Sequence, residues 1–137
     1  MLIAIVDAGP LYAAADADDD DHASCLSVLQ RPDLELVVPA LVVAEATYLV
    51  GRRLGARIEA AFLGGLTAVE VEAPTEGDWP VIAALVEQYR DFPLGGTDAS
   101  VAVLADRLDT NLIVTLDRRH FSAIRSTRQR PYHLLPE

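Results

Sequence analysis

The sequence predicts an α/β domain with a mainly parallel sheet and helices on both of its faces. Short apolar runs of strand length alternate with helical segments along the chain, which is the pattern of β-α-β units. No internal repeat, linker or low-complexity tail interrupts this order. The 137 residues, 51% of them hydrophobic, are enough to build one core, so we expect residues 1–137 to form a single domain.

The first strand and its following helices are marked by turn residues. Leu2–Val6 is apolar throughout and ends at Asp7 and a Gly-Pro pair. A short helix is expected over Leu11–Ala15. The acidic run Asp16–Asp21 then forms a solvated turn, and its last acids can cap a helix that continues to about Leu29.

The middle of the chain is expected to contain a second short strand, Glu35–Val38, and two helices. Pro39 suits the first turn of the first helix because its missing N–H would be unpaired there in any case. This helix should end before Gly55, and the next should cover Ile58–Leu66. Ala68–Val71 alternates like a strand.

The last part of the chain is expected to begin with a long helix, Thr75–Tyr89, in which Trp79, Ile82, Val86 and Tyr89 share one face. A loop, a helix, a strand, a short helix and a final strand follow, with these expected bounds: Phe92–Gly96, Asp98–Leu108, Leu112–Leu116, Arg118–Ile124 and Tyr132–Leu135.

Composition narrows the setting of the protein. No apolar stretch approaches the roughly 20 residues that span a bilayer, and Met1–Val6 carries no basic leader. A single cysteine, Cys25, cannot form an internal disulfide, and its apolar neighbours favour plain burial. We therefore expect a cytoplasmic protein without a membrane segment.

The formal charge of −10 argues against a non-specific nucleic-acid coat, because phosphate backbones require many basic contacts. It does not exclude a nuclease whose acidic centre holds cations. All eleven basic residues are arginines, and several gather near the C-terminus. We interpret this group as a candidate phosphate contact, with a solvated basic face as the alternative: Arg118, Arg119, Arg125, Arg128 and Arg130.

Two carboxylates follow predicted strands directly, Asp7 after Leu2–Val6 and Asp117 after Leu112–Leu116. Ligands of an open parallel sheet gather beyond the carboxyl ends of its strands. Each acid could instead be the N-cap of the next helix. Two such acids at one edge of the sheet favour a functional site.

Glu45 and Asp98 lie on predicted helices. Glu45 is the only charge between Pro39 and Val50, and it interrupts an apolar face. A buried carboxylate needs a cation, which is a metal ion or a nearby arginine, here Arg52 or Arg53. Asp98 stands at a helix start, where it could be a metal ligand or could complement the helix dipole.

Together Asp7, Glu45, Asp98 and Asp117 predict a carboxylate cluster suited to Mg²⁺ or Mn²⁺, which prefer hard oxygen ligands. Such an ion activates bound water and neutralises charge on a phosphodiester. The acids would otherwise repel this substrate, so the hypothesis requires the metal.

At this point the sequence resembles the PIN-domain ribonucleases, and especially the VapC-type toxins of bacterial toxin–antitoxin pairs. Four short segments carry the resemblance, and their order and spacing cover nearly the whole chain: Ile5–Leu11, Val43–Glu45, Pro93–Ser100 and Thr115–Phe121. None departs seriously from the family pattern.

The resemblance implies a five-stranded parallel sheet in the order 3-2-1-4-5 within a three-layer sandwich. It implies an endoribonuclease that cleaves single-stranded or looped RNA with divalent metal, and it makes Asp7, Glu45, Asp98 and Asp117 catalytic metal ligands. Thr115 would support the site through its hydroxyl or be an ordinary strand residue. A homodimer held inactive by a small antitoxin is also implied.

Several rival classes fail on single residues. Receiver domains and haloacid-dehalogenase-type phosphatases need a lysine, which this chain lacks. The acidic run Asp16–Asp21 does not match a calcium-binding EF-hand loop. His22 and His120 have no pattern that demands acid–base chemistry, so we expect surface or capping roles for both.

Two alternatives to the toxin stay open. One is a PIN nuclease of RNA processing without an antitoxin. The other is a catalytically silent α/β module that binds a protein partner, with the acids serving only as caps. The positions of the four carboxylates discriminate, because a nuclease brings them together with few basic residues among them.

Overall fold

A computed structural model describes residues 1–126 and 130–137. Five strands form one sheet in the order β3-β2-β1-β4-β5, and all neighbouring strands are parallel. This confirms the predicted fold class and strand order. The strands are β1 (Leu2–Val6), β2 (Leu34–Pro39), β3 (Glu70–Glu72), β4 (Leu112–Val114) and β5 (His133–Leu135).

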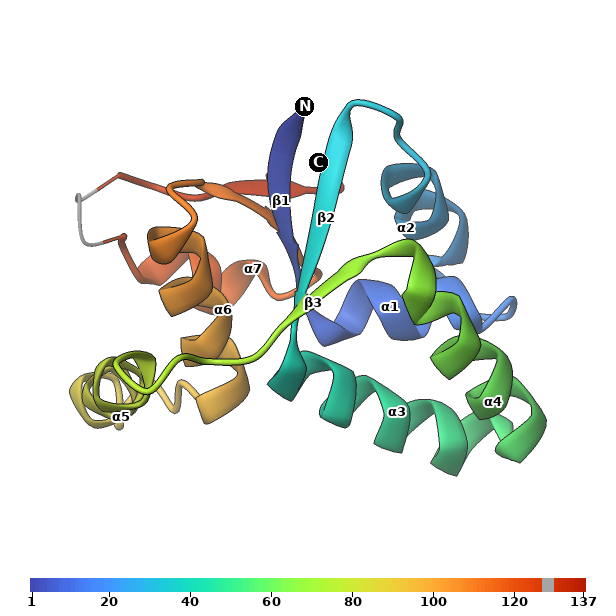
Figure 1. Cartoon of the computed structure of the whole chain (residues 1–137), viewed down its shortest axis with the longest axis horizontal. Helices are drawn as coiled ribbons and strands as arrows, with labels where there is room; N and C mark the ends of the chain where they lie inside the picture. The colour runs from blue at the N-terminus through green and yellow to red at the C-terminus, as the bar shows by residue number, and fades with distance from the viewer. Residues whose placement is uncertain (127–129) are drawn as a thin grey trace.

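Helices lie on both sides of the sheet. Figure 1 shows α1, α2 and α4 on one side and α5, α6 and α7 on the other, while α3 runs along the lower edge. The helices are α1 (Ala8–Ala15), α2 (His22–Leu29), α3 (Ala40–Leu54), α4 (Ala56–Gly65), the 3-10 helix η1 (Leu66–Ala68), α5 (Asp78–Gln88), α6 (Gly96–Arg107) and α7 (Arg118–Ala123).

Some predicted helix starts were wrong, and capping explains two of them. Helix α1 begins at Ala8, three residues earlier than predicted, because Asp7 accepts a hydrogen bond from the Ala8 N–H. Helix α5 begins at Asp78 rather than Thr75, because the Asp78 carboxylate bonds back to the Thr75 N–H across a preceding turn. Asp21 precedes α2 but makes no side-chain capping bond.

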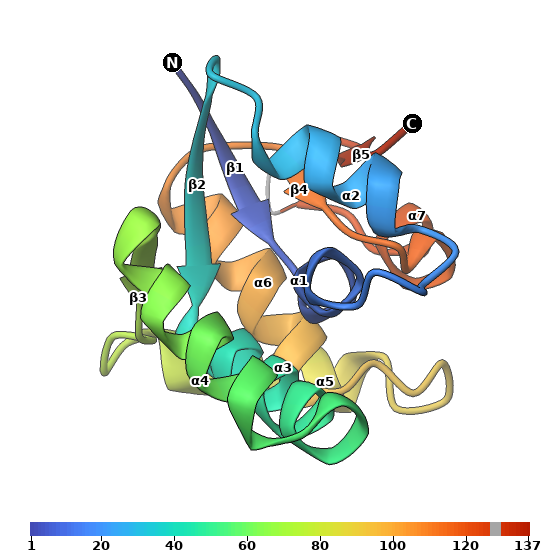
Figure 2. The same cartoon turned by 90° about the vertical axis from the view of Figure 1, so that its right-hand side faces the viewer.

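Burial is concentrated in the sheet and in α6. The strand residues Ile5, Val38 and Ile113 are fully buried or nearly so. Every residue from Ala99 to Ala105 in α6 is buried, and Figure 2 shows α6 behind β1 and β2. Cys25 is buried, as predicted. None of the described helices combines the length and apolarity needed to cross a membrane.

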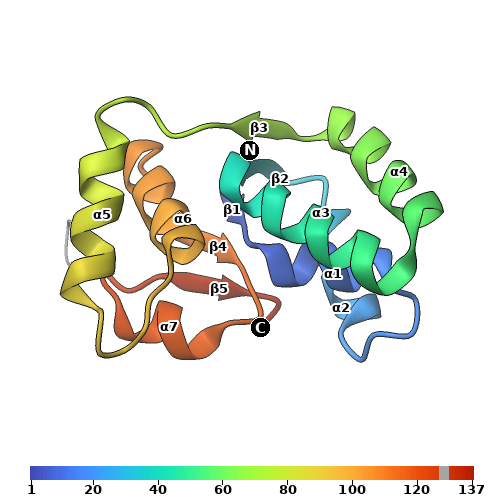
Figure 3. The same ribbon diagram turned by 90° about the horizontal axis from the view of Figure 1, so that it is seen from below.

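The strand order creates a switch point between β1 and β4. The chain leaves β1 toward β2 on one side, whereas β5 lies beyond β4 on the other. Crevices for ligands form at such points, beyond the carboxyl ends of the strands. Figure 3 looks onto this edge, where α1, α3, α6 and α7 meet.

Candidate metal centre

All four predicted acids line one cavity of about 400 Å³ at this edge. Its lining consists of Asp7, Gly9, Glu45, Asp98, Leu116 and Asp117. The carboxylates come from the end of β1, from α3, from the first turn of α6 and from the residue before α7. Segments up to 110 positions apart in the sequence therefore meet at one acidic pocket.

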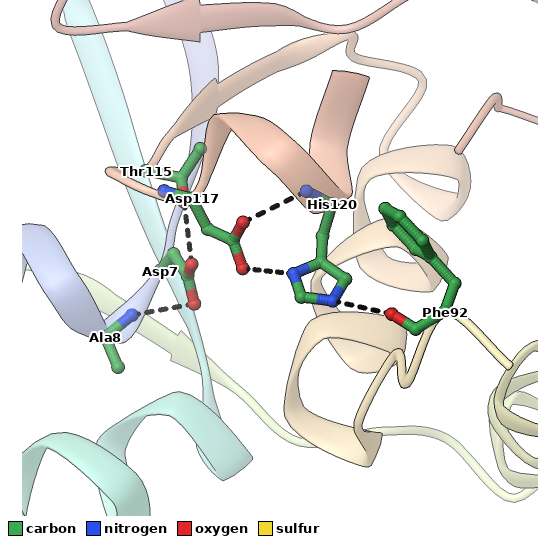
Figure 4. A network of polar contacts seen from close by, with 6 residues as sticks. All are labelled: Asp7, Ala8, Phe92, Thr115, Asp117 and His120. Atoms are coloured by element: carbon green, nitrogen blue, oxygen red, sulfur yellow. Dashed lines mark hydrogen bonds and ion pairs between the residues drawn. The ribbon is translucent and has the colours of Figure 1, made fainter. Parts of the chain in front are cut away.

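Asp7 is held rigidly at the floor of the cavity, with 6% of its surface exposed. Its backbone N–H donates to the Val114 carbonyl, which ties it to β4. One carboxylate oxygen accepts from the Ala8 N–H at 2.8 Å and the other accepts from the Thr115 hydroxyl at 2.8 Å (Figure 4). Burial raises the pKa of Asp7 despite these two hydrogen bonds.

Thr115 connects two of the acids. Its hydroxyl donates to Asp7 and accepts from the Asp117 N–H at 3.0 Å, and the side chain is buried. Since both partners are acids of the pocket, Thr115 is more than an ordinary strand residue. It sets the spacing between the ends of β1 and β4.

Asp117 caps α7 and contacts His120, for which a surface or capping role was expected. Its carboxylate accepts from the His120 N–H at 3.0 Å and lies 2.6 Å from His120 Nδ1. His120 Nε2 lies 3.1 Å from the Phe92 carbonyl, as Figure 4 shows. Because a carbonyl only accepts, Nε2 carries a proton. His120 therefore lies in the capped first turn of α7, with its ring held between Asp117 and the Phe92 carbonyl at 17% side-chain exposure.

Asp117 also decides the charge preference of this histidine. Burial alone would lower the pKa of His120, but the hydrogen bond and the charge of Asp117 outweigh burial and raise it. The sequence signal was a histidine three residues after a strand-end acid, which places both groups on the first turn of one helix.

Asp98 is also perturbed by its surroundings in the pocket. It lies in the first turn of α6 and is partly buried. Desolvation and the nearby charges of Asp7 and Asp117 raise its pKa to about 7. The predicted stabilisation by the helix dipole does not compensate for these effects.

Glu45 faces the same cavity from α3, on the exposed rim rather than in a buried face. Burial and the charge of Asp7 raise its pKa. Neither arginine considered as its partner contacts it: Arg52 donates to the Tyr48 hydroxyl, and Arg53 stacks over the Tyr12 ring.

The donor set fits a divalent cation. The described lining holds four carboxylates and no arginine, so nothing within it neutralises their charge. Oxygen ligands of this kind suit Mg²⁺ or Mn²⁺. Asp98, Asp117 and His120 form a group whose ligand atoms all lie within 4.8 Å of one another, and this group does not include Asp7 or Glu45. Their roles as metal ligands stay a prediction.

The C-terminal arginines split into several environments. Arg118 donates to the Pro136 carbonyl, and Arg119 lies over the Phe92 ring at 5.1 Å. Arg125 donates to the Ser122 carbonyl, and Arg130 pairs with Asp109 at 3.5 Å. Arg128 lies outside the described residues. Arg118 and Arg119 are the two nearest in sequence to the acidic pocket.

Comparison with known proteins identifies relatives over most of the chain. The PIN domain family model matches residues 4–126. Ribonuclease VapC26 of Mycobacterium tuberculosis is 42% identical over 123 residues, which covers 88% of this chain and 91% of that protein.

Two solved structures share the fold at low sequence identity. The sarcin-ricin-loop-cleaving toxin VapC20 of Mycobacterium tuberculosis superposes with a TM-score of 0.73 at 20% identity, covering 81% of this chain and 86% of that one. A chain of a toxin–antitoxin complex from Klebsiella pneumoniae gives 0.69 at 14% identity, covering 88% and 92%.

Proposed function

The chain belongs to the PIN-domain family, and from this premise we propose that it is a cytoplasmic, metal-dependent endoribonuclease and the toxin of a toxin–antitoxin pair. One observation carries the catalytic part. Four carboxylates from four separate elements line one cavity, and no described arginine lies among them. Acids that served only as helix caps would have no reason to meet.

In this proposal Asp7, Glu45, Asp98 and Asp117 hold Mg²⁺, or Mn²⁺, in the pocket. Such an ion, when bound, lowers the pKa of a coordinated water and neutralises charge on the phosphodiester. Two further residues orient these carboxylates. The Thr115 hydroxyl holds Asp7, and His120, whose ring is fixed by the Phe92 carbonyl, holds Asp117.

The antitoxin part of the proposal has support from an apolar groove. A hollow of about 490 Å³ lies between α1, α2 and α4, and its lining is almost wholly apolar, including Leu11, Leu26, Ile58 and Phe62. An exposed apolar groove of this kind suits the apolar face of a partner helix. A similar fold occurs in a toxin–antitoxin complex from Klebsiella pneumoniae.

We also expect a homodimer. On α5, Trp79 of the stripe predicted from the sequence is 49% exposed although Ile82 of the same stripe is buried, and Val81, outside that stripe, is 45% exposed. Apolar surface of this size is consistent with coverage by a second copy. Light scattering of the purified protein measures the subunit number, and a monomer at micromolar concentration would contradict this expectation.

The catalytic proposal is tested by incubating the protein with RNA in Mg²⁺ or in EDTA. We expect cleavage only with the ion, and a loss of at least a hundredfold in Glu45→Gln because a charged ligand is removed. Glu35→Gln, which makes the same change at an exposed position of β2, is the matched control. Equal cleavage by both variants would refute the role of Glu45.

The toxin assignment is tested separately from catalysis. Expression of the protein should arrest growth, and co-expression of the small protein encoded beside it should restore growth. Cleavage without growth arrest would favour the alternative of a PIN nuclease that serves RNA processing without an antitoxin.

A further inference from the structure

Two arginines of helix α3 each lie against a tyrosine, and the two arginine–tyrosine pairs differ in what surrounds them. In the first pair, Arg53 lies 5.1 Å from the ring centre of Tyr12. Tyr12 is 8% exposed, and its hydroxyl donates to Asp16 at 2.7 Å. The tyrosine of this pair is buried and hydrogen-bonded, and its contact with the exposed Arg53 joins α1 to α3.

The second pair is open to solvent. Tyr48 is 62% exposed, and its hydroxyl accepts a hydrogen bond from Arg52 at 3.4 Å. Within residues 1–126 and 130–137, no carboxylate forms an ion pair with Arg52. A large aromatic ring and a positive charge are therefore presented together, and the fold uses neither of them.

Helical geometry places this pair beside the acidic pocket. Positions 45, 48 and 52 are separated by three and four residues, so they lie along one stripe of α3. With a rise of about 1.5 Å per residue, Tyr48 is about 4.5 Å and Arg52 about 10.5 Å along the axis from Glu45. A stacked strand advances about 3.4 Å per nucleotide, so the pair is one to three nucleotides from the pocket.

We propose that Tyr48 and Arg52 form a substrate shelf that binds single-stranded RNA next to the cleavage site, Tyr48 by stacking on a base and Arg52 by contacting a phosphate. The inference rests on the proposed ribonuclease function. It also answers a physical problem, since a chain of charge −10 with an acidic pocket needs local cations to attract RNA. Tyrosine stacks on every base, so the shelf is tolerant of sequence.

The test measures RNA binding without cleavage, by fluorescence anisotropy of a labelled 12-nucleotide single strand in an Asp98→Asn background. Tyr48→Ala should weaken binding about fivefold to a hundredfold, the range of lost base stacking, and leave the salt dependence unchanged. Tyr48→Phe, which keeps the ring, should bind within about twofold of the parent.

Arg52→Ala should lower the slope of log Kd against log salt by about 0.7, the value for one phosphate contact to a single strand. Arg57→Ala is the matched control, because Arg57 is also exposed but lies on α4, away from the stripe. This control should change neither affinity nor slope.

Parent-like binding by Tyr48→Ala and Arg52→Ala would overturn the shelf, and so would an Arg57→Ala effect equal to that of Arg52→Ala. If Tyr48→Ala and Arg52→Ala weakened binding of the antitoxin but left RNA binding unchanged, the pair would serve a protein partner. This result would also overturn the proposal. Because the readout is binding, a protein that failed to cleave RNA would refute the nuclease without deciding the shelf.

Discussion

Two clusters of carboxylates in this molecule each bring together acids from separate elements, but among the described residues only one of them includes an arginine. At the end of β3, Glu72 and Asp78 of α5 meet Arg107 of α6, with ion-pair distances of 3.3 and 3.0 Å. Beyond the ends of β1 and β4, four acids meet at one cavity, where no described arginine lines the wall. Both clusters join segments far apart in sequence.

The difference shows what each cluster is for. Arg107 neutralises its acids from within the chain, and it also donates toward the Ala73 carbonyl, so this cluster fastens β3, α5 and α6 together. The acidic pocket has no arginine in its described lining, and desolvation together with the charges of Asp7 and Asp117 raises the pKa of Asp98 to about 7. Within the described part of the chain, one acidic cluster is paired with an arginine and the other is not, and this difference supports the proposal that the second binds an external cation.

The largest expected effect is on catalysis. Asp98→Asn should reduce metal-dependent RNA cleavage by at least a hundredfold while the fold stays intact, because it removes a charge from the pocket centre. Initial rates on a labelled RNA and a circular dichroism spectrum measure the two quantities. Asp20→Asn, at an exposed position of the acidic turn, is the control. Full activity of Asp98→Asn would end the assignment of this residue.

The Arg107 cluster should respond in the opposite way. Arg107→Ala leaves Asp78 without its partner at 13% side-chain exposure, so the free energy of unfolding should fall by about 2–3 kcal/mol. Activity per folded molecule should be retained. Urea unfolding measures the change, with Arg90→Ala, which breaks an exposed pair with Glu87, expected to cost less than about 0.5 kcal/mol. Equal losses in both variants would contradict the distinction.

In the presence of EDTA, which removes divalent ions, the acidic pocket should also make the free energy of unfolding depend on pH. The pKa of Asp98 is raised to about 7 in the folded state, from near 3.8 in the unfolded chain. The folded state therefore binds more protons between these values, and the free energy of unfolding should fall as pH rises from about 4 to 7.

The size of this loss should be on the order of 1 kcal/mol, because solvent screens a group that is only partly buried. The raised pKa of His120 adds a loss of the same sign near neutral pH, so the comparison with Asp98→Asn isolates the carboxyl. Melts at pH 5 and pH 8 measure it. A wild-type protein with the same pH dependence as Asp98→Asn would contradict the perturbed pKa.

A smaller effect on catalysis than that of Asp98→Asn is expected from the loss of the Thr115 hydroxyl, which lies between two acids. Thr115→Val keeps the shape of a buried strand residue but removes the bond to Asp7 and the acceptor for the Asp117 N–H. We expect a loss of about 1–2 kcal/mol in stability and about tenfold in cleavage. Thr67→Val, at an exposed residue of η1, should change neither quantity. Normal cleavage by Thr115→Val would show that the Thr115 hydroxyl does not support the site.

Most of the sheet could be predicted from the sequence because β1, β2 and β4 are largely apolar runs bounded by turn residues, whereas β3 was indicated only by alternation. Asp7 and Asp117 could be placed for the same reason, since an acid directly after a parallel strand must emerge at the carboxyl edge. The first residues of the helices were harder to predict. The bonds from Asp7 to Ala8 and from Asp78 to Thr75 depend on side-chain directions that periodicity does not reveal.

The remaining differences come from contacts between distant segments. The place of His120 depends on the Phe92 carbonyl, 28 positions earlier, and no local pattern predicts that meeting. Arg52 and Arg53 are both within reach of Glu45 by sequence alone, yet they face tyrosines instead. The exposure of Trp79 likewise depends on what packs against α5, not on the spacing of its apolar residues.

Calorimetric titration of the purified protein with Mg²⁺ and Mn²⁺ at pH 7 tests the central claim most directly. The account predicts binding accompanied by release of a fraction of a proton, because Asp98 is partly protonated at this pH and must ionise to become a ligand. It predicts much weaker binding in Asp98→Asn and unchanged binding in Arg107→Ala. Absence of binding in the wild type, or equal binding in Asp98→Asn, would contradict the claim that the acidic pocket is kept for a cation.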